Sequence, residues 1–335
     1  MTACDLRVTW IVLLALTASI NAQQSTSTHA SIPSYDDPSV ALVTSGLELA
    51  SALANPYKSW AILNSSFGTD DSDWTTNITR TSNFTISGQP GLATSYPVLA
   101  LNFVKAKILL DGPVALVFQH LVLQGFRSLP LTQSPGLDLL INPPADAGAL
   151  VVVAEALLVL RICVPHTINQ DQLLVNITRP AALPGKQTAS SNVSQAGCTN
   201  TSLLPAAQAA LVPYVSRCWP DAGMYGDIAV ACSDVDSFGR ATATHYSLQL
   251  LRTEFVCTEV MTAECVGRLG PLGCFLFMFP RTPPSPMPSP SPPTPPALPN
   301  SPPVAAAAAA GAAAGALAAE AAGRGPAGEA AAGDV

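Results

Sequence analysis

The segments Val114–Leu123, VALVFQHLVL, and Ala149–Leu160, ALVVVAEALLVL, are apolar runs, and the second echoes the first about 35 positions later. Each has the length of two short strands. Strands that are buried on more than one side form near-continuous apolar runs rather than a clean alternation of apolar and polar residues. The two segments therefore predict parallel strands that stack on one another.

Shorter runs of the same kind, each closed by Gly, Asn, Pro or Ser, surround these two segments: WAILN (60–64), NFTISG (83–88), PVLALNFVKAKILLDG (97–112) and GLDLLINPP (136–144). Thr85–Gly88 and Leu109–Gly112 also resemble each other at a separation of 24 positions. Repeats of this length predict a mainly β fold, a right-handed parallel β-helix in which each coil stacks on the next. The alternative is a β-sandwich of about seven short strands.

The predicted domain covers residues 44–279 and begins with a helix over Ser45–Ala54, in which Ser45 and Glu48 form a capping box. A helix that covers the first coil favours the β-helix. Residues 165–220 predict a long glycosylated loop. Strand pattern returns at Thr242–Cys257, and a short helix is expected at Thr262–Leu269.

The N-terminus has the layout of a secretory signal peptide. Arg7 precedes an apolar run at Val8–Ala18, and small residues follow up to Ala22. An uncleaved membrane anchor is the alternative, but a spanning helix needs about 20 apolar residues. We therefore expect a signal peptide over residues 1–22, a linker over residues 23–43, and secretion to the extracellular matrix, cell wall or cell surface.

Six N-x-Ser/Thr sequences support this route, because they are acceptors for N-glycans in secreted proteins. They begin at Asn64, Asn77, Asn83, Asn176, Asn192 and Asn200. Only 11% of the residues are charged, against about 25% in ordinary soluble domains. We expect attached sugar to supply the solubility that the missing charges do not.

Seven cysteines follow the signal peptide, and all lie between residues 163 and 274. In an oxidising compartment they predict a disulfide-stapled C-terminal part with one free thiol, although sequence leaves the pairing open. We expect Cys163, at the end of an apolar run, to be the free thiol. The disulfide candidates are then Cys198, Cys218, Cys232, Cys257, Cys265 and Cys274, with the last three close together. No spacing of cysteine and histidine predicts a metal site.

Two tails of biased composition follow the domain. Residues 280–303 are rich in proline and predict an extended polyproline II stalk. Residues 304–335 are rich in alanine and glycine and predict a disordered or weakly helical end. A membrane helix is the alternative, because Gly311 and Gly315 have the spacing of packed membrane helices, but the apolar run is short.

The runs NFTISG, PVLALNFVKAKILL and VALVFQHLVLQGFRS, with RCWPDAGMY and HYSLQLLRTEFVCTEVMTAECVGRLGPLGC further on, resemble a group of secreted green-algal proteins. That group has a pectin-lyase-like right-handed β-helix domain and then a Pro-rich segment, which is similar to hydroxyproline-rich wall glycoproteins. The resemblance covers residues 44–303. It implies a fold and a location, not an active site.

The chemistry of the chain excludes some functions and leaves others open. A net charge of −7 and a pI near 5.0 exclude nucleic acid as a partner. The Asn-Thr-Asp and Gly-His-Gly motifs of β-helix pectin hydrolases are missing. His120, His166 and His245 are isolated in the sequence, and no cofactor motif is present.

Two charged groups remain as candidates for binding. Asp70, Asp71 and Asp73 predict a solvated acidic loop, with a Ca²⁺ site as the alternative. Lys105 and Lys107 lie on one face of a predicted strand, where they could contact an acidic polysaccharide.

We therefore expect a non-enzymatic glycoprotein that contacts cell-wall polysaccharide or matrix glycoproteins. A polysaccharide-active enzyme and the ectodomain of a membrane-anchored receptor are the alternatives.

Overall fold

A computed structural model describes residues 33–89, 95–165, 168, 174–191, 193–236 and 239–280. They belong to one compact unit of the chain, Met1–Arg281. Within them the fold is mainly β, with a large curled sheet and a smaller one, and few helices. The predicted signal peptide and both predicted tails lie outside the described residues, apart from Pro280.

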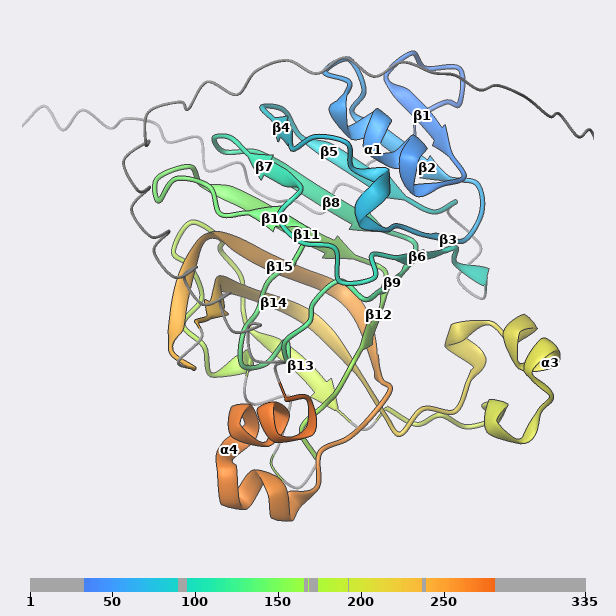
Figure 1. The fold of residues 1–335 in the computed structure, drawn as a ribbon, viewed down its shortest axis with the longest axis vertical. Coiled ribbons are helices and arrows are strands. Elements are labelled where there is room, and N and C mark those ends of the chain that lie inside the picture. The colour runs from blue at the N-terminus through green and yellow to red at the C-terminus, as the bar shows by residue number, and fades with distance from the viewer. Residues whose placement is uncertain are drawn as a thin grey trace, which may run out of the picture. The chain divides into compact units, whose positions relative to one another are not determined.

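The first set of parallel strands follows the apolar runs of the sequence: β1 (Val40–Val43), β2 (Trp60–Leu63), β5 (Phe84–Ser87), β8 (Ala115–Gln119) and β11 (Ala149–Ala154). Figure 1 shows β5, β8 and β11 side by side. Thr85 of β5 lies opposite Val117 of β8, and Val117 lies opposite Val152 of β11. Because β1 pairs with β2, the prediction that residues 23–43 are a linker is wrong at its C-terminal end.

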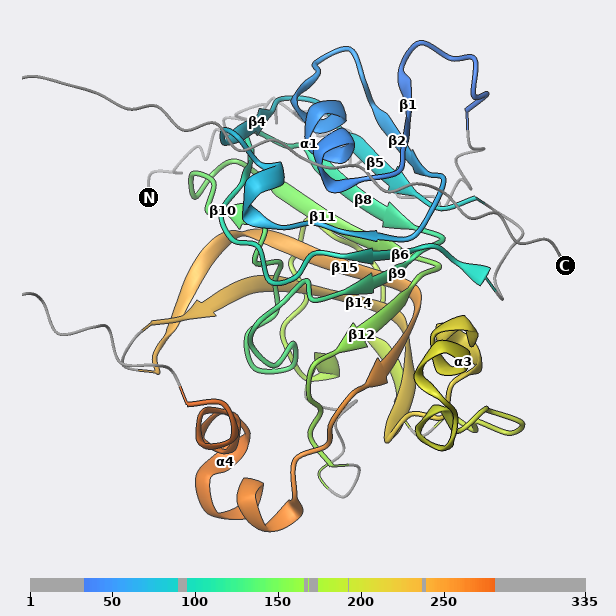
Figure 2. The same cartoon turned by 45° about the vertical axis from the view of Figure 1, so that its right-hand side comes forward.

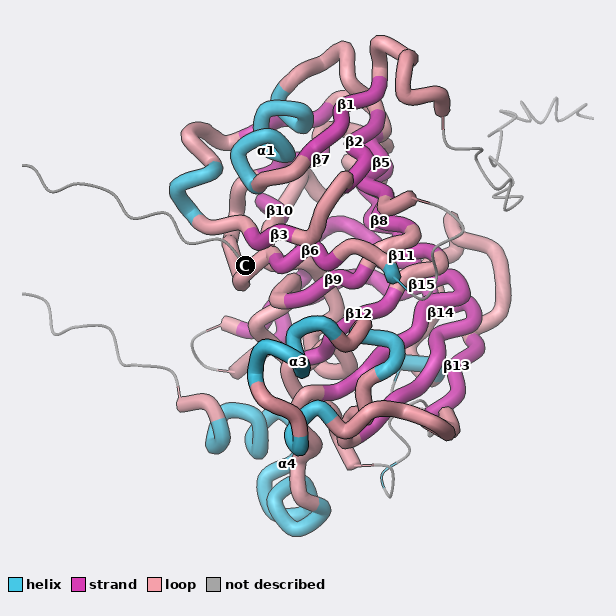
Figure 3. The backbone as a smooth tube through the Cα atoms, turned by 90° about the vertical axis from the view of Figure 1, so that its right-hand side faces the viewer, coloured by secondary structure: helices cyan, strands magenta, loops and turns pink. Residues whose placement is uncertain are grey.

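Two further sets of parallel strands complete the repeat. One contains β3 (Phe67–Gly68), β6 (Val98–Ala100), β9 (Val122–Gln124) and β12 (Leu157–Leu160), and the other contains β4 (Ile78–Arg80), β7 (Ile108–Leu110) and β10 (Leu140–Ile141). The chain visits the three sets in turn, so each strand pairs with the strand one repeat later. In Figure 3 the first set and the β3 set form neighbouring columns.

This register confirms one sequence repeat and contradicts another. The echo of Val114–Leu123 in Ala149–Leu160 is confirmed, because β8 pairs with β11 and β9 pairs with β12. The match of Thr85–Gly88 with Leu109–Gly112 is wrong, because β5 pairs with β8 whereas β7 pairs with β4 and β10. The β-sandwich alternative also fails for these strands, since their pairing is parallel and that of a sandwich is antiparallel.

The C-terminal strands depart from the repeat. The long strand β15 (Ala241–Cys257) confirms the strand predicted at Thr242–Cys257. It pairs with β11 through its middle, Tyr246–Leu251, and with β12 through its C-terminal end, Glu254–Cys257. It thereby joins two of the parallel sets into one sheet. On its other side β15 pairs antiparallel with β14 (Asp221–Val235), and β14 pairs with β13 (Thr188–Ser191). Figure 2 shows β14 and β15 curving together below β11.

The first helix, α1 (Gly46–Ala54), begins and ends where the sequence predicts. The Ser45 side chain accepts a hydrogen bond from the Glu48 backbone N–H, but Glu48 Oε2 accepts from Thr44 N (2.7 Å), one residue earlier than in the predicted capping box. At the other end the buried Arg80 guanidinium donates to the backbone oxygens of Leu53 and Asn55. Both ends of α1 are therefore fixed by side chains.

The last helix, α4 (Ala263–Met278), is longer than the one predicted. Thr262 caps it, and the chain leaves helical geometry at Gly270, where φ is 71°, before a second half that starts with Pro271. The other described helical elements are shorter. They are α3 (Ala206–Leu211) and three single 3-10 turns, η1 (Asp71–Asp73), η4 (Thr201–Leu203) and η5 (Tyr214–Ser216). No helix in the described ranges is both long and apolar enough to cross a membrane.

The cysteines form three disulfides: Cys163–Cys257, Cys198–Cys218 and Cys265–Cys274. Among the described residues Cys232 of β14 is the one free cysteine, and it is buried. The predictions that Cys163 is free and that Cys232 forms a disulfide are therefore wrong. Cys163 and Cys257 are 94 positions apart in sequence, and the pairing of β12 with β15, continued by the bridge of Cys163 with Val260, brings them together.

Candidate functional site

The strands β9, β12 and β15 present apolar side chains on both faces. Leu123, Leu158 and Phe255 point into the main core, so their neighbours in the strands point the other way. These neighbours form a second cluster of Val122, Leu157, Val159 and Val256, with Ala222 of β14. Tyr96, Tyr214 and Trp219 pack against this cluster. An aromatic layer therefore covers the outer face of the sheet.

A groove of about 420 Å³ lies at this layer. One wall is the loop that contains residues 193–198 and 215–219, and the other is formed by β14 and β15. Trp219, Arg217 and Glu254 are among the lining residues. The groove therefore combines an indole, a cation and a carboxylate over an apolar floor.

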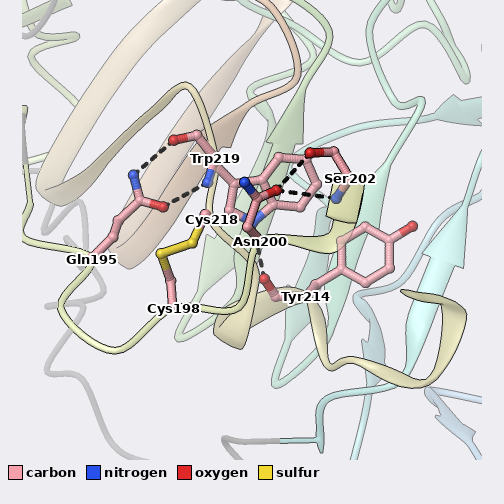
Figure 4. The surroundings of a disulfide bond; sticks show 7 residues. All are labelled: Gln195, Cys198, Asn200, Ser202, Tyr214, Cys218 and Trp219. Atoms are coloured by element: carbon pink, nitrogen blue, oxygen red, sulfur yellow. Dashed lines mark hydrogen bonds between the residues drawn. A yellow bond between two sulfur atoms is a disulfide. The ribbon is translucent and has the colours of Figure 1, made fainter. Parts of the chain in front are cut away.

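The loop wall is held by covalent and polar links (Figure 4). The Cys198–Cys218 disulfide closes it, and the backbone N–H of Cys218 donates to Thr199 O (3.0 Å). The Gln195 side chain reaches across the loop: its Nε2 donates to Trp219 O (2.9 Å), and its Oε1 accepts from Trp219 N (2.7 Å). The position of Trp219 is thus fixed from both sides of its own peptide.

The aromatic side chains of the loop are fixed as well. The rings of Tyr214 and Trp219 stack with centroids 5.8 Å apart, and Trp219 Nε1 donates to Tyr214 O (3.0 Å). The Tyr214 hydroxyl donates to Gln124 Oε1 of β9 (2.9 Å). The Arg217 guanidinium lies 4.0 Å from the centre of the Tyr214 ring. These contacts preorganise the groove before any ligand arrives.

Two charged side chains of the groove keep polar atoms without a hydrogen-bond or ion-pair partner among the described residues. The Arg217 Nε donates to Val212 O, but its Nη groups have no hydrogen bond or ion pair within the described part of the chain. Glu254 is exposed, and its carboxylate has no ion pair with any described residue. Both are therefore free to contact a ligand.

A polar ladder adjoins the groove, at the turn between the first strand set and the second. His120, Glu155 and Arg252 occupy equivalent positions in three successive layers, with φ of 54°, 49° and 44°. His120 Nε2 lies 3.0 Å from Glu155 Oε2, and Arg252 Nε donates to Glu155 Oε1 (3.0 Å). Tyr96 packs edge-on against His120. Burial, with the negative charges of Glu155 and Glu254, raises the pKa of Tyr96, so its hydroxyl stays protonated.

Sequence reasoning treated His120 as isolated and missed Glu155, Arg252 and the groove residues. A signal for the ladder was present, because His120 and Glu155 interrupt the two echoed apolar runs at the same position. The groove had no such signal. Its walls come from a loop and a hairpin that meet only in the folded chain.

The lysines predicted to contact polysaccharide lie elsewhere. Lys105 and Lys107 are in the loop between β6 and β7 and not on a strand, because Ala106 has a φ of 52° and breaks the alternation. Lys107 Nζ forms an ion pair with Asp71 Oδ1 (3.0 Å). Neither lysine lines the groove.

The acidic loop has internal partners. Asp70 caps η1 by accepting from Ser72 N, and Asp73 Oδ2 accepts from Asp70 N. No group of three metal-binding side chains occurs among the described residues. The carboxylates of this loop therefore have partners within the loop and, for Asp71, in Lys107.

The acceptor asparagines for N-glycans can be placed in five of six cases, and all five are exposed: Asn64, Asn77, Asn83, Asn176 and Asn200. Asn192 and His166 lie outside the described residues. Asn200 is in the loop of the groove, where its Oδ1 accepts from Ser202 N (3.1 Å).

Comparisons with models of known protein families, with curated proteins and with solved structures find no match. The residues of the groove themselves therefore indicate its chemistry. Glycoside hydrolysis ordinarily needs a pair of carboxylates across the scissile bond, and Glu254 is the one carboxylate among the described lining residues. Fixed aromatic rings with uncommitted polar groups suit the binding of a hydroxyl-rich ligand.

Proposed function

We propose that this chain is a secreted, N-glycosylated protein of the cell surface or extracellular matrix that binds glycan through the groove at Trp219. In this proposal the three strand sets form a right-handed parallel β-helix, and the Pro-rich segment is a stalk. The chain acts as a binding protein and not as an enzyme. Its partners are cell-wall polysaccharide or matrix glycoproteins.

The pairing of the strands supports the β-helix. The chain passes through the three parallel sets in a fixed order at least twice, and side-chain bonds join equivalent positions of successive layers. Asn83 Oδ1 accepts from Ala115 N, for example, across 32 positions. Three disulfides and five exposed acceptor asparagines support passage through an oxidising, glycosylating compartment.

The groove carries the proposal of glycan binding. Sugar rings have apolar faces that pack on aromatic side chains, and hydroxyl groups that exchange hydrogen bonds with charged side chains. The groove offers both, with Trp219 fixed by the hydrogen bonds of Gln195 and with Arg217 and Glu254 uncommitted.

The test is binding of the purified full-length secreted protein to a panel of wall and matrix polysaccharides, measured by affinity electrophoresis and calorimetry. Arg217→Gln and Glu254→Gln should each weaken retention about tenfold, which corresponds to the loss of one charged hydrogen bond of about 1.4 kcal/mol. Arg240→Gln is the matched control, because Arg240 is exposed and contacts Asp236 outside the groove.

Two results would reject the proposal. One is a protein that binds no member of the panel. The other is binding that survives both groove substitutions unchanged. New reducing or unsaturated chain ends after incubation would instead support the enzymatic alternative.

A further inference from the structure

A second cavity, of about 310 Å³, lies at the other end of the sheet beside α1. Leu47, Ala50 and Ala54 of the helix form one side, and the segment from Asp73 to Ile78 forms the other. The two sides approach closely at Gly46, where a Cβ atom would lie 2.1 Å from Asp73 Oδ2. The cavity is therefore a defined recess between a helix and a loop.

One feature of the recess lacks a cover among the described residues. Leu47 lines the recess with 56% of its surface exposed, although Leu49, Ala50, Ala52 and Leu53 of the same helix are buried. Trp74 also lines the recess but is only 4% exposed, so it belongs to the wall. The recess therefore has an apolar rim at Leu47 that no described residue covers.

The sequence places an attachment point at the rim. Asn77 begins the acceptor sequence Asn77-Ile78-Thr79, its side chain is exposed, and its neighbours Thr76 and Ile78 both line the recess. A sugar attached here starts beside the cavity and is held near it at high effective concentration.

The first sugar of an N-glycan, N-acetylglucosamine, suits this recess. Its acetyl methyl group and ring face are apolar and can cover Leu47. Its own N–H and O–H groups can donate to Asp73, whose carboxylate lines the recess.

We infer that the N-glycan of Asn77 folds back onto this recess, so that its innermost N-acetylhexosamine covers Leu47 and completes the N-terminal end of the fold. This inference rests on the proposed function, because the chain must pass through a glycosylating compartment. It gives one of the six acceptor sites a structural role that exposure alone would not assign.

The experiment compares Thr79→Ala with Thr79→Ser in the full-length secreted protein. Both alter the exposed Thr79 side chain, but only Thr79→Ala removes the acceptor sequence. Mass spectrometry of glycopeptides reports occupancy, and hydrogen exchange reports the protection of residues 46–54. We expect amides of α1 to exchange about threefold faster or more in Thr79→Ala, with no change in Thr79→Ser. Asn64→Gln, which removes a neighbouring acceptor, should leave α1 unchanged.

A double-mutant cycle identifies the contact itself. Leu47→Ala should lower the unfolding midpoint more in the glycosylated Thr79→Ser protein than in Thr79→Ala. Equal effects in both backgrounds would overturn the inference. If Leu47→Ala also converted a dimer to a monomer by light scattering, a second copy would be the cover instead.

Mass spectrometry also tests the premise that Asn77 carries an N-glycan. An unmodified Asn77 in the secreted protein would overturn the inference, whereas sugar on the other acceptor asparagines would leave the proposed function standing. Sugar on none of them would contradict both.

Discussion

The stacked strands from β2 to β12 and the part of the chain after Cys163 keep their structure by different means. The stacked strands contain no cysteine and bury apolar side chains above one another, as Ile86, Phe118 and Val153 do. The later part carries all three disulfides, and its loop at residues 193–219 contributes only partly buried side chains. A repeated layer is stabilised by packing on the layers next to it. A loop that occurs once, such as residues 193–219, has no such neighbours and is held by cross-links instead.

The difference also separates stability from function. The stacked strands contribute the main core on one face and, through Val122, Leu157 and Val159, an apolar layer on the other. In the loop, the disulfide and the Gln195 bonds hold Trp219 and Arg217 at a groove without burying them fully. Cross-links thus allow binding side chains to stay accessible while their backbone is fixed.

The largest expected effect tests the core of the stacked strands. Phe118 of β8 is fully buried, and Val117 beside it points to the other face of the strand and is half-buried. Phe118→Ala should lower the free energy of unfolding by about 3–5 kcal/mol, and Val117→Ala by less than about 1 kcal/mol. Urea denaturation followed by circular dichroism measures both. Equal losses would mean that the alternation assigned to β8 is wrong.

The next effect tests the cross-linked loop. The Cys198–Cys218 disulfide spans 20 positions, so Cys198→Ser with Cys218→Ser should destabilise the loop by about 3 kcal/mol through the entropy of the opened chain. Hydrogen exchange should show lost protection in residues 193–219 and none in β8 or β11. Lost protection in those strands would show that the two regions are one cooperative unit.

Much of the fold could be predicted from the sequence because repetition amplifies weak signals. Every apolar run quoted from the stacked region contains at least one strand of the structure, and the echo of Val114–Leu123 in Ala149–Leu160 gives the register of β8 with β11. The antiparallel pairing of β14 with β15 could not be predicted, because it occurs once and no repeat indicates it. The disulfide partner of Cys163 could not be predicted either, since no local pattern indicates a contact between two cysteines 94 positions apart.

The groove could not be predicted from sequence. Trp219 and Glu254 are brought together by the long hairpin, and neither residue belongs to a motif. Lys105 and Lys107 were predicted to share a strand face, but the structure has a turn there. The positive φ of Ala106 causes the turn, and nothing in the sequence indicates it. The sequence therefore suggested the kind of ligand, a polysaccharide, but not the place in the fold where it would bind.

A smaller effect concerns the buried thiol at the junction of the two regions. Burial raises the pKa values of Cys232 and Tyr246 above their ordinary values of 9.0 and 10.0. The folded state therefore keeps protons that the unfolded state releases, and this stability is present below pH 9 and is lost as the pH rises above it. We expect a loss of up to about 1.4 kcal/mol per pH unit for each group.

The control for this pH effect is Cys232→Ala, which should flatten the slope between pH 9 and 10 even if it lowers stability overall. A thiol reagent should find no reactive cysteine in the native protein and one after denaturation. A rapidly reacting native thiol would contradict the pairing of Cys163 with Cys257.

The smallest expected effect decides which region binds glycan. Lys107→Met breaks the ion pair with Asp71, in which the Asp71 side chain is 80% exposed, so stability should change by less than about 1 kcal/mol. Retention on polysaccharide should also stay unchanged, in contrast to Arg217→Gln. If Lys107→Met weakened retention as strongly as Arg217→Gln, basic side chains in the loops between the stacked strands would contribute to binding. The separation of a structural region from a binding region would then fail, because the repeat itself would supply part of the ligand surface.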